Sequence, residues 1–159
     1  PFGHAGERVL EDYYLEHIVL CLSDGLLAQC GIDLDTHRGE IATGNLSSLR
    51  GCPFVLGSAE DIGGRIGRGL LRSSGVSPVS KATSENVETL LALCEQGVGA
   101  CFCPENLLHT ALSPAQLAHL HILPLCPQAS YPICFGYLSR SYPWSVLSEF
   151  IRIAREQTA

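Results

Sequence analysis

The stretch ATSENVETLLALCEQGVGACFCPENLL, residues 82–108, decides the fold of this chain. Thr83 or Ser84 suits the start of a helix, because a hydroxyl oxygen can accept a hydrogen bond from an unpaired amide of the first turn. Apolar residues then recur three and four positions apart, which places them on one face of a helix that ends at Gly97. The residues of this apolar face are Val87, Leu90, Leu91 and Cys94. The stretch therefore predicts an amphipathic helix directly after a polar start.

Strands and helices alternate on both sides of this helix. Residues 98–103, VGACFC, are apolar throughout, which is typical of a strand covered on both faces. Pro104 then fits the first turn of a further helix. Earlier in the chain, residues 52–57 and 76–82 predict strands, and residues 58–75 predict the helix between them. Alternation at this spacing predicts an α/β fold with right-handed crossovers and a mainly parallel sheet.

The remaining segments have a less regular pattern. Residues 17–22, HIVLCL, predict a buried strand, and residues 23–50 predict a long excursion with little regular structure. Residues 119–125 and 131–139 predict two further strands. A final helix is expected to start near Trp144, because an apolar face recurs after it.

The composition fits one globular domain. Of the 159 residues, 46% are hydrophobic and 16% are charged, which excludes a disordered chain. No apolar run approaches the roughly 18 residues needed to span a bilayer, and no signal peptide is visible at the start. The net charge is −6, whereas a duplex-binding module needs a basic face. Arg65, Arg68 and Arg72 recur at helical spacing, which favours a solvated helix face.

Most of the eight cysteines lie in apolar runs, where a free cysteine behaves as a small buried hydrophobe. We therefore expect reduced thiols and a cytoplasmic protein. No C-x-x-C pair and no cysteine–histidine cluster with zinc spacing occurs, so we expect no metal and no cofactor. Cys101 and Cys103 could act as a thiol sensor. However, residues two apart on a strand have parallel side chains, which is poor geometry for a disulfide.

Polar residues follow two of the predicted strands. In an open α/β sheet, ligands bind beyond the carboxyl ends of strands and against helix N-termini. Ser58 and Ala59 follow one strand, and Thr83, Ser84 and Asn86 follow the next. Hydroxyls, unpaired amides and a positive helix end favour a carboxylate, a phosphate or a similar anion. The same residues would also serve as plain helix caps, and spacing alone leaves that alternative open.

Three segments together resemble the effector-binding domain of LysR-type transcriptional regulators. Residues 82–108 are similar to the capped helix and the G-x-G-apolar-apolar-x-P strand of that family. Residues 46–58, LSSLRGCPFVLGS, resemble its linker helix and the strand that enters the effector cleft. Residues 131–156 resemble its closing strand and C-terminal helix. The resemblance implies a periplasmic-binding-protein-like fold of type 2, with an effector cleft between two α/β lobes.

The resemblance also implies which lobe each segment belongs to. Residues 1–22 would form part of the first lobe and a crossover strand, and residues 23–123 would form the complete second, effector-binding lobe. Residues 124–159 would form the return crossover strand and the C-terminal helix of the first lobe. The winged helix-turn-helix of the family would lie outside this chain, together with most of the first lobe.

The resemblance implies a set of effector contacts. Ser58 matches the position after the entering strand, and Gly99 matches the strand that borders the cleft. The full expected set is Ser58, Ala59, Thr83, Ser84, Asn86 and Gly99. The implied partners are a small-molecule effector, DNA bound through the winged helix-turn-helix, and further copies in a homodimer or homotetramer, with no membrane. The peroxide-sensing branch has cysteines just ahead of this helix, but residues 74–81, SGVSPVSK, have none.

Two other functions stay open at this point. A solute-binding protein of a transporter would share the fold, although eight free thiols do not suit an oxidising compartment. An enzyme would need a nucleophile and a base. The candidates are Ser84, Cys101, Cys103, His109, His119 and His121. None of them lies in a catalytic motif, so we expect no enzyme. The sequence leaves open the effector, the target genes and the choice between activation and repression.

Overall fold

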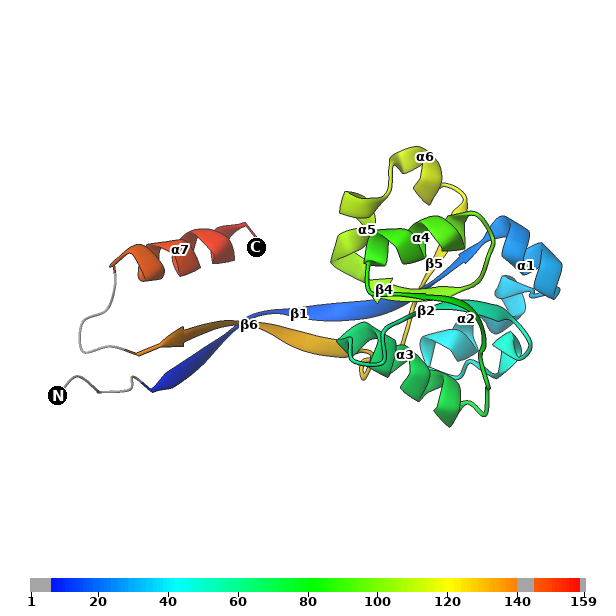
Figure 1. The fold of residues 1–159 in the computed structure, drawn as a ribbon, viewed down its shortest axis with the longest axis horizontal. Coiled ribbons are helices and arrows are strands. Elements are labelled where there is room, and N and C mark those ends of the chain that lie inside the picture. Colours follow the sequence, from blue (N-terminus) through cyan, green and yellow to red (C-terminus); the bar gives the residue numbers. More distant parts are fainter. Residues whose placement is uncertain (1–6, 140–144, 158–159) are drawn as a thin grey trace. The chain divides into compact units, whose positions relative to one another are not determined.

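The computed structural model describes residues 7–139 and 145–157. By its contacts the chain divides into two units. The larger unit, here called the lobe, comprises residues 17–131. The smaller, here called the flanking unit, comprises residues 1–16 and 132–159. Each unit has its own helices, and two long strands, β1 (Arg8–Ser23) and β6 (Ser130–Leu138), belong to both units (Figure 1).

The sheet of the lobe is mixed. Its strands are the last part of β1 (Arg8–Ser23), β2 (Pro53–Gly57), β3 (Val79–Ser84), β4 (Cys101–Pro104) and β5 (Leu120–Pro124). β2 and β3 are parallel, and Phe54 forms a parallel bridge with Ala100 just before β4. β1 lies between β4 and β5 and is antiparallel to both. The order across the sheet is therefore β3-β2-β4-β1-β5.

The prediction of a mainly parallel sheet is confirmed for β2, β3 and β4. Two hydrogen bonds join β2 to the segment before β4, from the amide of Val55 to the carbonyl of Ala100 and from the amide of Ala100 to the carbonyl of Pro53, both 2.9 Å long. β1 is the exception, because no βαβ crossover of this lobe joins it to β4. The alternation rule therefore applied to the strands after residue 52 and not to the strand before it.

Helices cover the sheet on both sides. They are α1 (Asp24–Cys30), α2 (Leu34–Ala42), α3 (Ile62–Ser73), α4 (Val87–Glu95), α5 (Glu105–Ala111) and α6 (Pro114–Leu117), with a 3-10 turn at Ser47–Leu49. Figure 1 shows α2 and α3 on one side and α4 and α5 on the other. β1 shows the corresponding alternation: Ile18 and Leu20 pack with one helix layer, and Val19 and Cys21 pack with the other.

Residues 23–50 are more regular than the sequence indicated. The expectation of little regular structure is wrong, because α1 and α2 lie in this segment. Ser23 begins α1 by accepting a hydrogen bond from the amide of Leu26, and Asp33 begins α2 by accepting one from the amide of Asp35. Both helices are short, so neither shows enough turns for a clear apolar period.

The two helices beside the candidate site start later than predicted. α3 begins after Asp61 and not at Ser58, since the Asp61 carboxylate accepts from the amide of Gly64. α4 begins after Asn86 and not at Thr83 or Ser84, since the Asn86 side chain accepts from the amide of Thr89. Several polar residues in a row can all cap a helix, and the strand before each helix decides which of them is free to do so.

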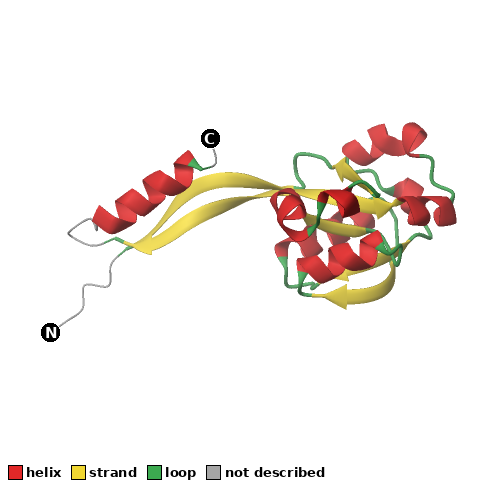
Figure 2. Ribbon diagram, turned by 90° about the horizontal axis from the view of Figure 1, so that it is seen from above, coloured by secondary structure: helices red, strands yellow, loops and turns green. Residues whose placement is uncertain are grey.

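The flanking unit pairs β6 (Ser130–Leu138) with β1 and adds α7 (Ser145–Glu156). Figure 2 shows β6 beside the first part of β1. The Tyr13 hydroxyl donates to the carbonyl of Ala154 over 2.9 Å, and the Phe135 ring contacts Tyr13 and Phe150. The predicted helix start near Trp144 lies outside the described residues. The lobe boundaries expected at residues 22/23 and 123/124 stay a prediction.

Candidate functional site

The parallel pairing of β2 and β3 brings two polar turns together. Gly57, the last residue of β2, lies opposite Ser84, the last residue of β3. The turn with Ser58 and Ala59 and the turn with Asn86 therefore leave the same edge of the sheet next to each other. This juxtaposition is the one that the strand-end argument predicted.

Ser58 organises the turn after β2. Its Oγ accepts a hydrogen bond from the amide of Glu60 over 3.2 Å, and its carbonyl accepts one from the amide of Asp61 over 3.3 Å. Gly64 lies against this turn so closely that a Cβ on it would be 2.1 Å from the Ser58 carbonyl oxygen. The first turn of α3 therefore needs glycine at this position. Ala59 is exposed beside it.

Ser84 and Asn86 organise the turn after β3. Ser84 Oγ accepts from the amide of Asn86 over 3.1 Å, and Asn86 Oδ1 accepts from the amide of Thr89 over 2.9 Å. The Thr83 side chain is exposed, and its hydroxyl has no hydrogen-bond partner among the described residues. Of the predicted contacts, Thr83 thus offers the hydroxyl that the fold itself leaves unused.

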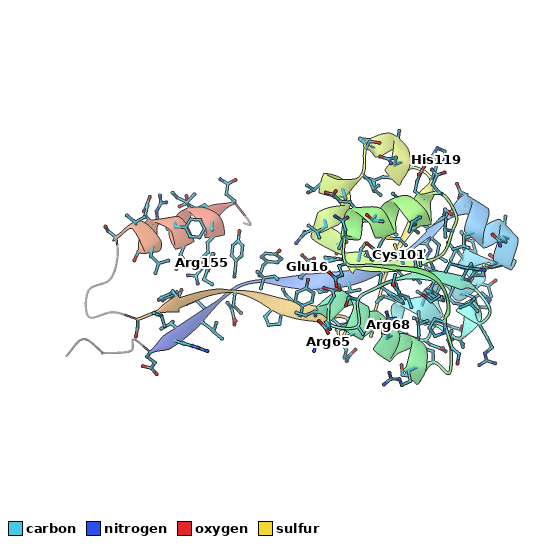
Figure 3. All side chains as sticks on the ribbon, viewed as in Figure 1. Glu16, Arg65, Arg68, Cys101, His119 and Arg155 are labelled. Carbon is cyan, nitrogen blue, oxygen red and sulfur yellow. The ribbon has the colours of Figure 1, made fainter. Side chains whose placement is uncertain are left out.

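Charged groups surround the paired turns. Arg68 of α3, labelled in Figure 3, donates from Nη2 to the carbonyl of Gly57 over 2.7 Å, so its guanidinium contacts the residue just before Ser58. Glu60, Glu85 and Glu88 are exposed on the two turns and the first turn of α4. The caps Asp61 and Asn86 each occupy one first-turn amide of their helices, and the other first-turn amides form no bonds within the helices and can donate to a ligand. The edge therefore combines hydroxyl and amide donors with nearby carboxylates.

Gly99 lies away from this edge. A Cβ on it would be 2.8 Å from the carbonyl carbon of Phe54, so it packs on the backbone at the start of β2. Gly57 lies three residues further along the same strand. The structure therefore brings together Ser58, Ala59, Thr83, Ser84 and Asn86 but not Gly99. A contact between Gly99 and an effector stays a prediction.

Sequence reasoning missed a third turn at the same edge. Because Ala100 pairs with Phe54, β4 runs parallel to β2 and ends at Pro104, level with the end of β2. Pro104 also lies opposite Ile18, where β1 runs into the lobe. The same signal that found the other two turns, a strand end followed by a helix start, was present at Pro104 and could have found this one.

The cysteines lie mainly inside the lobe. Cys21, Cys94, Cys101 and Cys103 pack together in the core, with 3.6 Å between the Sγ atoms of Cys21 and Cys103. Hydrogen bonds with Cys103, Cys21 and Cys94, together with burial, raise the pKa of Cys101 well above its usual value. A neutral buried thiol is a poor nucleophile. Within residues 7–139 and 145–157, no cluster of three or more ligating side chains could hold a metal ion.

The histidines considered as bases lie apart from the paired turns. His109 is exposed in the last turn of α5. Nε2 of His121 lies 2.6 Å from Oδ1 of Asp24, and His119 lies 4.0 Å from the other oxygen. Asp24 is the first residue of α1, and sequence reasoning did not single it out. These contacts join the start of α1 to the start of β5, and no candidate nucleophile forms part of them.

Comparisons with known proteins agree on one family. The sequence model of the LysR substrate binding domain matches residues 9–159. No curated protein matches the chain. In the part of the chain that the structure describes, no helix combines the length and apolar character required to cross a membrane.

Solved structures similar to this chain are regulators or their ligand-binding domains. A putative LysR family transcriptional regulator from Pseudomonas aeruginosa has a TM-score of 0.69 at 17% identity, over 99% of this chain and 50% of that one. The regulatory domain of CcmR from Synechocystis PCC6803, in complex with 2-PG, has a TM-score of 0.68 at 10% identity, over 99% and 70%. The effector binding domain of QuiR, in complex with shikimate, has 0.62 at 11%, over 94% and 65%. The chain thus spans half of the first protein and about two thirds of the two domains.

Proposed function

The chain belongs to the LysR substrate-binding domain family, and from this premise we propose that it is the ligand-sensing regulatory domain of a LysR-type transcriptional regulator. The resemblance found in the sequence is confirmed, and so is the α/β fold of the periplasmic-binding-protein-like type 2. Domains of this family belong to transcriptional regulators, which is not an enzyme class. A cytoplasmic location is part of the proposal.

One observation carries the proposal: the pairing of Gly57 with Ser84 places two polar turns at one sheet edge. The hydroxyl of Thr83 has no partner among the described residues, and the first-turn amides of α3 and α4 that Asp61 and Asn86 do not cap remain donors. Such donors bind carboxylates and phosphates. We infer that the effector is a small anion held by these two turns, in a cleft between this lobe and a first lobe that the chain holds only in part.

The carboxylates of Glu60, Glu85 and Glu88 limit which anions can bind at the two turns. Each lies near the donors and repels a negative charge that is not directly hydrogen-bonded. The anionic group must therefore be compact and must reach the amides themselves. CcmR and QuiR were solved with small ligands, 2-PG and shikimate, and both compounds belong in the first panel tested here.

Binding would act by shifting a conformational equilibrium. A ligand shifts such an equilibrium only through its different affinities for the two states. We propose that effector binding changes the arrangement of the two lobes and, in the full-length homodimer or homotetramer, the binding of DNA through an N-terminal winged helix-turn-helix. The effector, the target genes and the direction of control are left to experiment.

The test compares two hydroxyl deletions on β3. Small carboxylates and phosphates are titrated by calorimetry into the 159-residue chain and its variants. Thr83→Val removes the unused hydroxyl, keeps the side-chain shape and should weaken effector binding at least about tenfold. Ser80→Ala removes an exposed hydroxyl at the other end of β3 and should leave the affinity unchanged. If both variants bind an effector as tightly as the parent, the site lies elsewhere.

The charge of the effector has a separate test. The methyl ester or amide of a bound carboxylate keeps its shape but loses its charge, so it should bind far more weakly. Equal affinity for the neutral analogue would contradict an anionic effector without contradicting the site. The alternative function, solute binding for a transporter, shares the fold, but the described structure holds eight free cysteines and no feature that favours it.

A further inference from the structure

A groove lies on the lobe, beside the C-terminal half of α3. It has a volume of about 370 Å³ and is formed between this helix and the segment that leads into β3. The residues that line it are Arg68, Arg72, Gly75, Val76, Ser77 and Pro78. A volume of this order is enough for a small molecule.

Positive charge concentrates at this groove. Arg68 and Arg72 line it, and a Cβ on Gly75 would lie 3.8 Å from Nη2 of Arg50. Two arginines thus line the groove and a third approaches it at Gly75, although the chain as a whole carries a net charge of −6. Within the described residues, none of the three forms an ion pair, and no carboxylate lines the groove. The positive charge is thus left uncompensated.

The groove is also held in shape. Arg68 is fixed by its hydrogen bond to the Gly57 carbonyl, which uses one of its five N–H donors. Gly75 has a φ of 66°, in the left-handed region that favours glycine, and this turns the chain from α3 into Ser77 and Pro78. Guanidinium groups bind oxyanions through paired N–H donors, and preorganised groups lose less freedom when they do so.

We propose that this groove, here called the arginine groove, binds a compact polyvalent oxyanion that carries phosphate groups. Arg68 and Arg72 are four residues apart on one helix face, so their guanidinium groups can hold two phosphates or two oxygens of one phosphate. The Ser77 hydroxyl adds a neutral donor. The bound species is a free phosphate or diphosphate, or the phosphate end of a metabolite.

The arginine groove is distinct from the paired turns. It lies along the C-terminal half of α3, whereas the paired turns lie at the start of that helix, beyond its cap Asp61. Arg68 links the two places, since it lines the groove and its guanidinium bonds to the residue before Ser58. An anion in the groove therefore contacts the side chain that supports that turn. The proposal does not depend on the identity of the effector.

The test uses two arginines of the same helix. Inorganic pyrophosphate and orthophosphate are titrated by calorimetry at constant ionic strength, since salt screens non-specific attraction. Arg72→Gln should weaken pyrophosphate binding at least tenfold. Arg65→Gln, the control, removes the same charge from an exposed position of α3 that does not line the groove, and it should change the affinity less than twofold. Circular dichroism checks that both variants are folded.

Nuclear magnetic resonance shows where pyrophosphate binds, in addition to how tightly it binds. Pyrophosphate should shift the amide resonances of Gly75 and Ser77 in the parent chain, and these shifts should be lost in Arg72→Gln. Equal loss of affinity in the two arginine variants would overturn the proposal, because it would mean only a long-range charge effect. Loss of binding in Thr83→Val but not in Arg72→Gln would also overturn it, by moving the anion to the paired turns.

A further experiment distinguishes a small phosphate-bearing anion from the phosphates of a nucleic acid. A duplex oligonucleotide offers phosphates of a macromolecule, whereas pyrophosphate and a phosphorylated sugar offer small anions. We expect the small anions to bind and the duplex not to bind, because the net charge of the chain repels it. Tighter binding of the duplex that depends on Arg72 would overturn the assignment to a small anion, as would the absence of any pyrophosphate binding.

Discussion

Two glycines of α3 set how closely this helix approaches its neighbours. A Cβ on Gly64 would lie 2.1 Å from the Ser58 carbonyl oxygen, and one on Gly67 would lie 2.4 Å from the Phe102 ring. The backbone turn at Ser58 cannot move away without disturbing the end of β2. At the scale of single residues, the shape of the candidate site therefore depends on glycine at position 64 as much as on the hydroxyl groups of the two turns.

We expect Gly64→Ala to destabilise the lobe by about 1–3 kcal/mol, because the new methyl group overpacks the turn. The control is Gly69→Ala on the same helix, where a Cβ meets nothing within 4 Å. That change should stabilise the lobe by about 0.5–1 kcal/mol, since alanine favours the helix. Urea unfolding measures both free energies. Similar values for the two variants would mean that α3 does not pack on Ser58 as described.

The thiols differ in their expected reactivity. Burial raises the pKa of Cys52 to about 12, so this thiol stays neutral at physiological pH. Cys30 and Cys134 are partly exposed, and a hydrogen bond with Asp12 raises the pKa of Cys134. Alkylation of the native chain near pH 8 should therefore label Cys30 first, Cys134 more slowly and the six buried thiols only after unfolding. Mass spectrometry reads the order, and early labelling of Cys101 would contradict it.

At the scale of elements, the starts of α1, α2, α3, α4 and α6 each depend on one side-chain cap. Asp33 begins α2, and the Asp35 amide and the Thr36 hydroxyl both donate to its carboxylate. The Thr36 hydrogen bond first, and then the Asp35 amide, lower the pKa of Asp33 below its usual value of 3.8. A carboxyl whose pKa is lowered by folding stabilises the folded state above the unfolded pKa. This contribution is lost as the pH falls through the folded pKa.

The first turn of α2 should therefore loosen as the pH falls below 3.8, the usual pKa of Asp33. Carbon chemical shifts of Asp33 and Thr36 during an acid titration measure this change. Asp33→Asn keeps a good helix cap but removes the titrating group, so the first turn should lose its pH dependence in this variant. If the variant shows the same acid transition as the parent, another carboxyl is responsible.

At the scale of the whole molecule, the two units differ in how well they bury their own apolar residues. The lobe buries residues on both faces of its sheet, from Leu71 of α3 on one face to Leu91 of α4 on the other. In the flanking unit, Val146 is 76% exposed and Phe150 59% exposed on α7. An exposed apolar helix face usually belongs to an interface. The proposed function predicts that the rest of the first lobe covers this apolar face of α7.

Residues 17–131 alone should therefore fold cooperatively. We expect the excised lobe to show one urea transition by circular dichroism and dispersed amide resonances, because its core is complete. The 159-residue chain should in addition bind a dye for exposed apolar surface through α7, and Phe150→Ser should reduce this binding. A molten spectrum of the excised lobe would show that its core depends on the flanking unit.

The sequence allowed most of the lobe to be predicted, for a local reason. Helix and strand periods, capping hydroxyls and glycine stops depend on neighbouring residues, so the stretch from residue 52 to Pro104 could be interpreted in order. The short helices within residues 23–50 were missed because one or two turns show no period. Gly99 was placed in the site by resemblance, and its contact with Phe54 depends on sheet packing that no local pattern encodes.

By itself, the sequence determined the order of strands and helices and the polar residues at the strand ends, because these follow from chemistry along the chain. Only the tertiary structure decided which of these ends meet. Hydrogen bonding between strands far apart in sequence sets Gly57 against Ser84 and makes β1 antiparallel to β4, and the packing of α3 lets Arg68 bond to the Gly57 carbonyl. Register and packing arise from contacts across the sheet, and such contacts become visible only once the chain has folded.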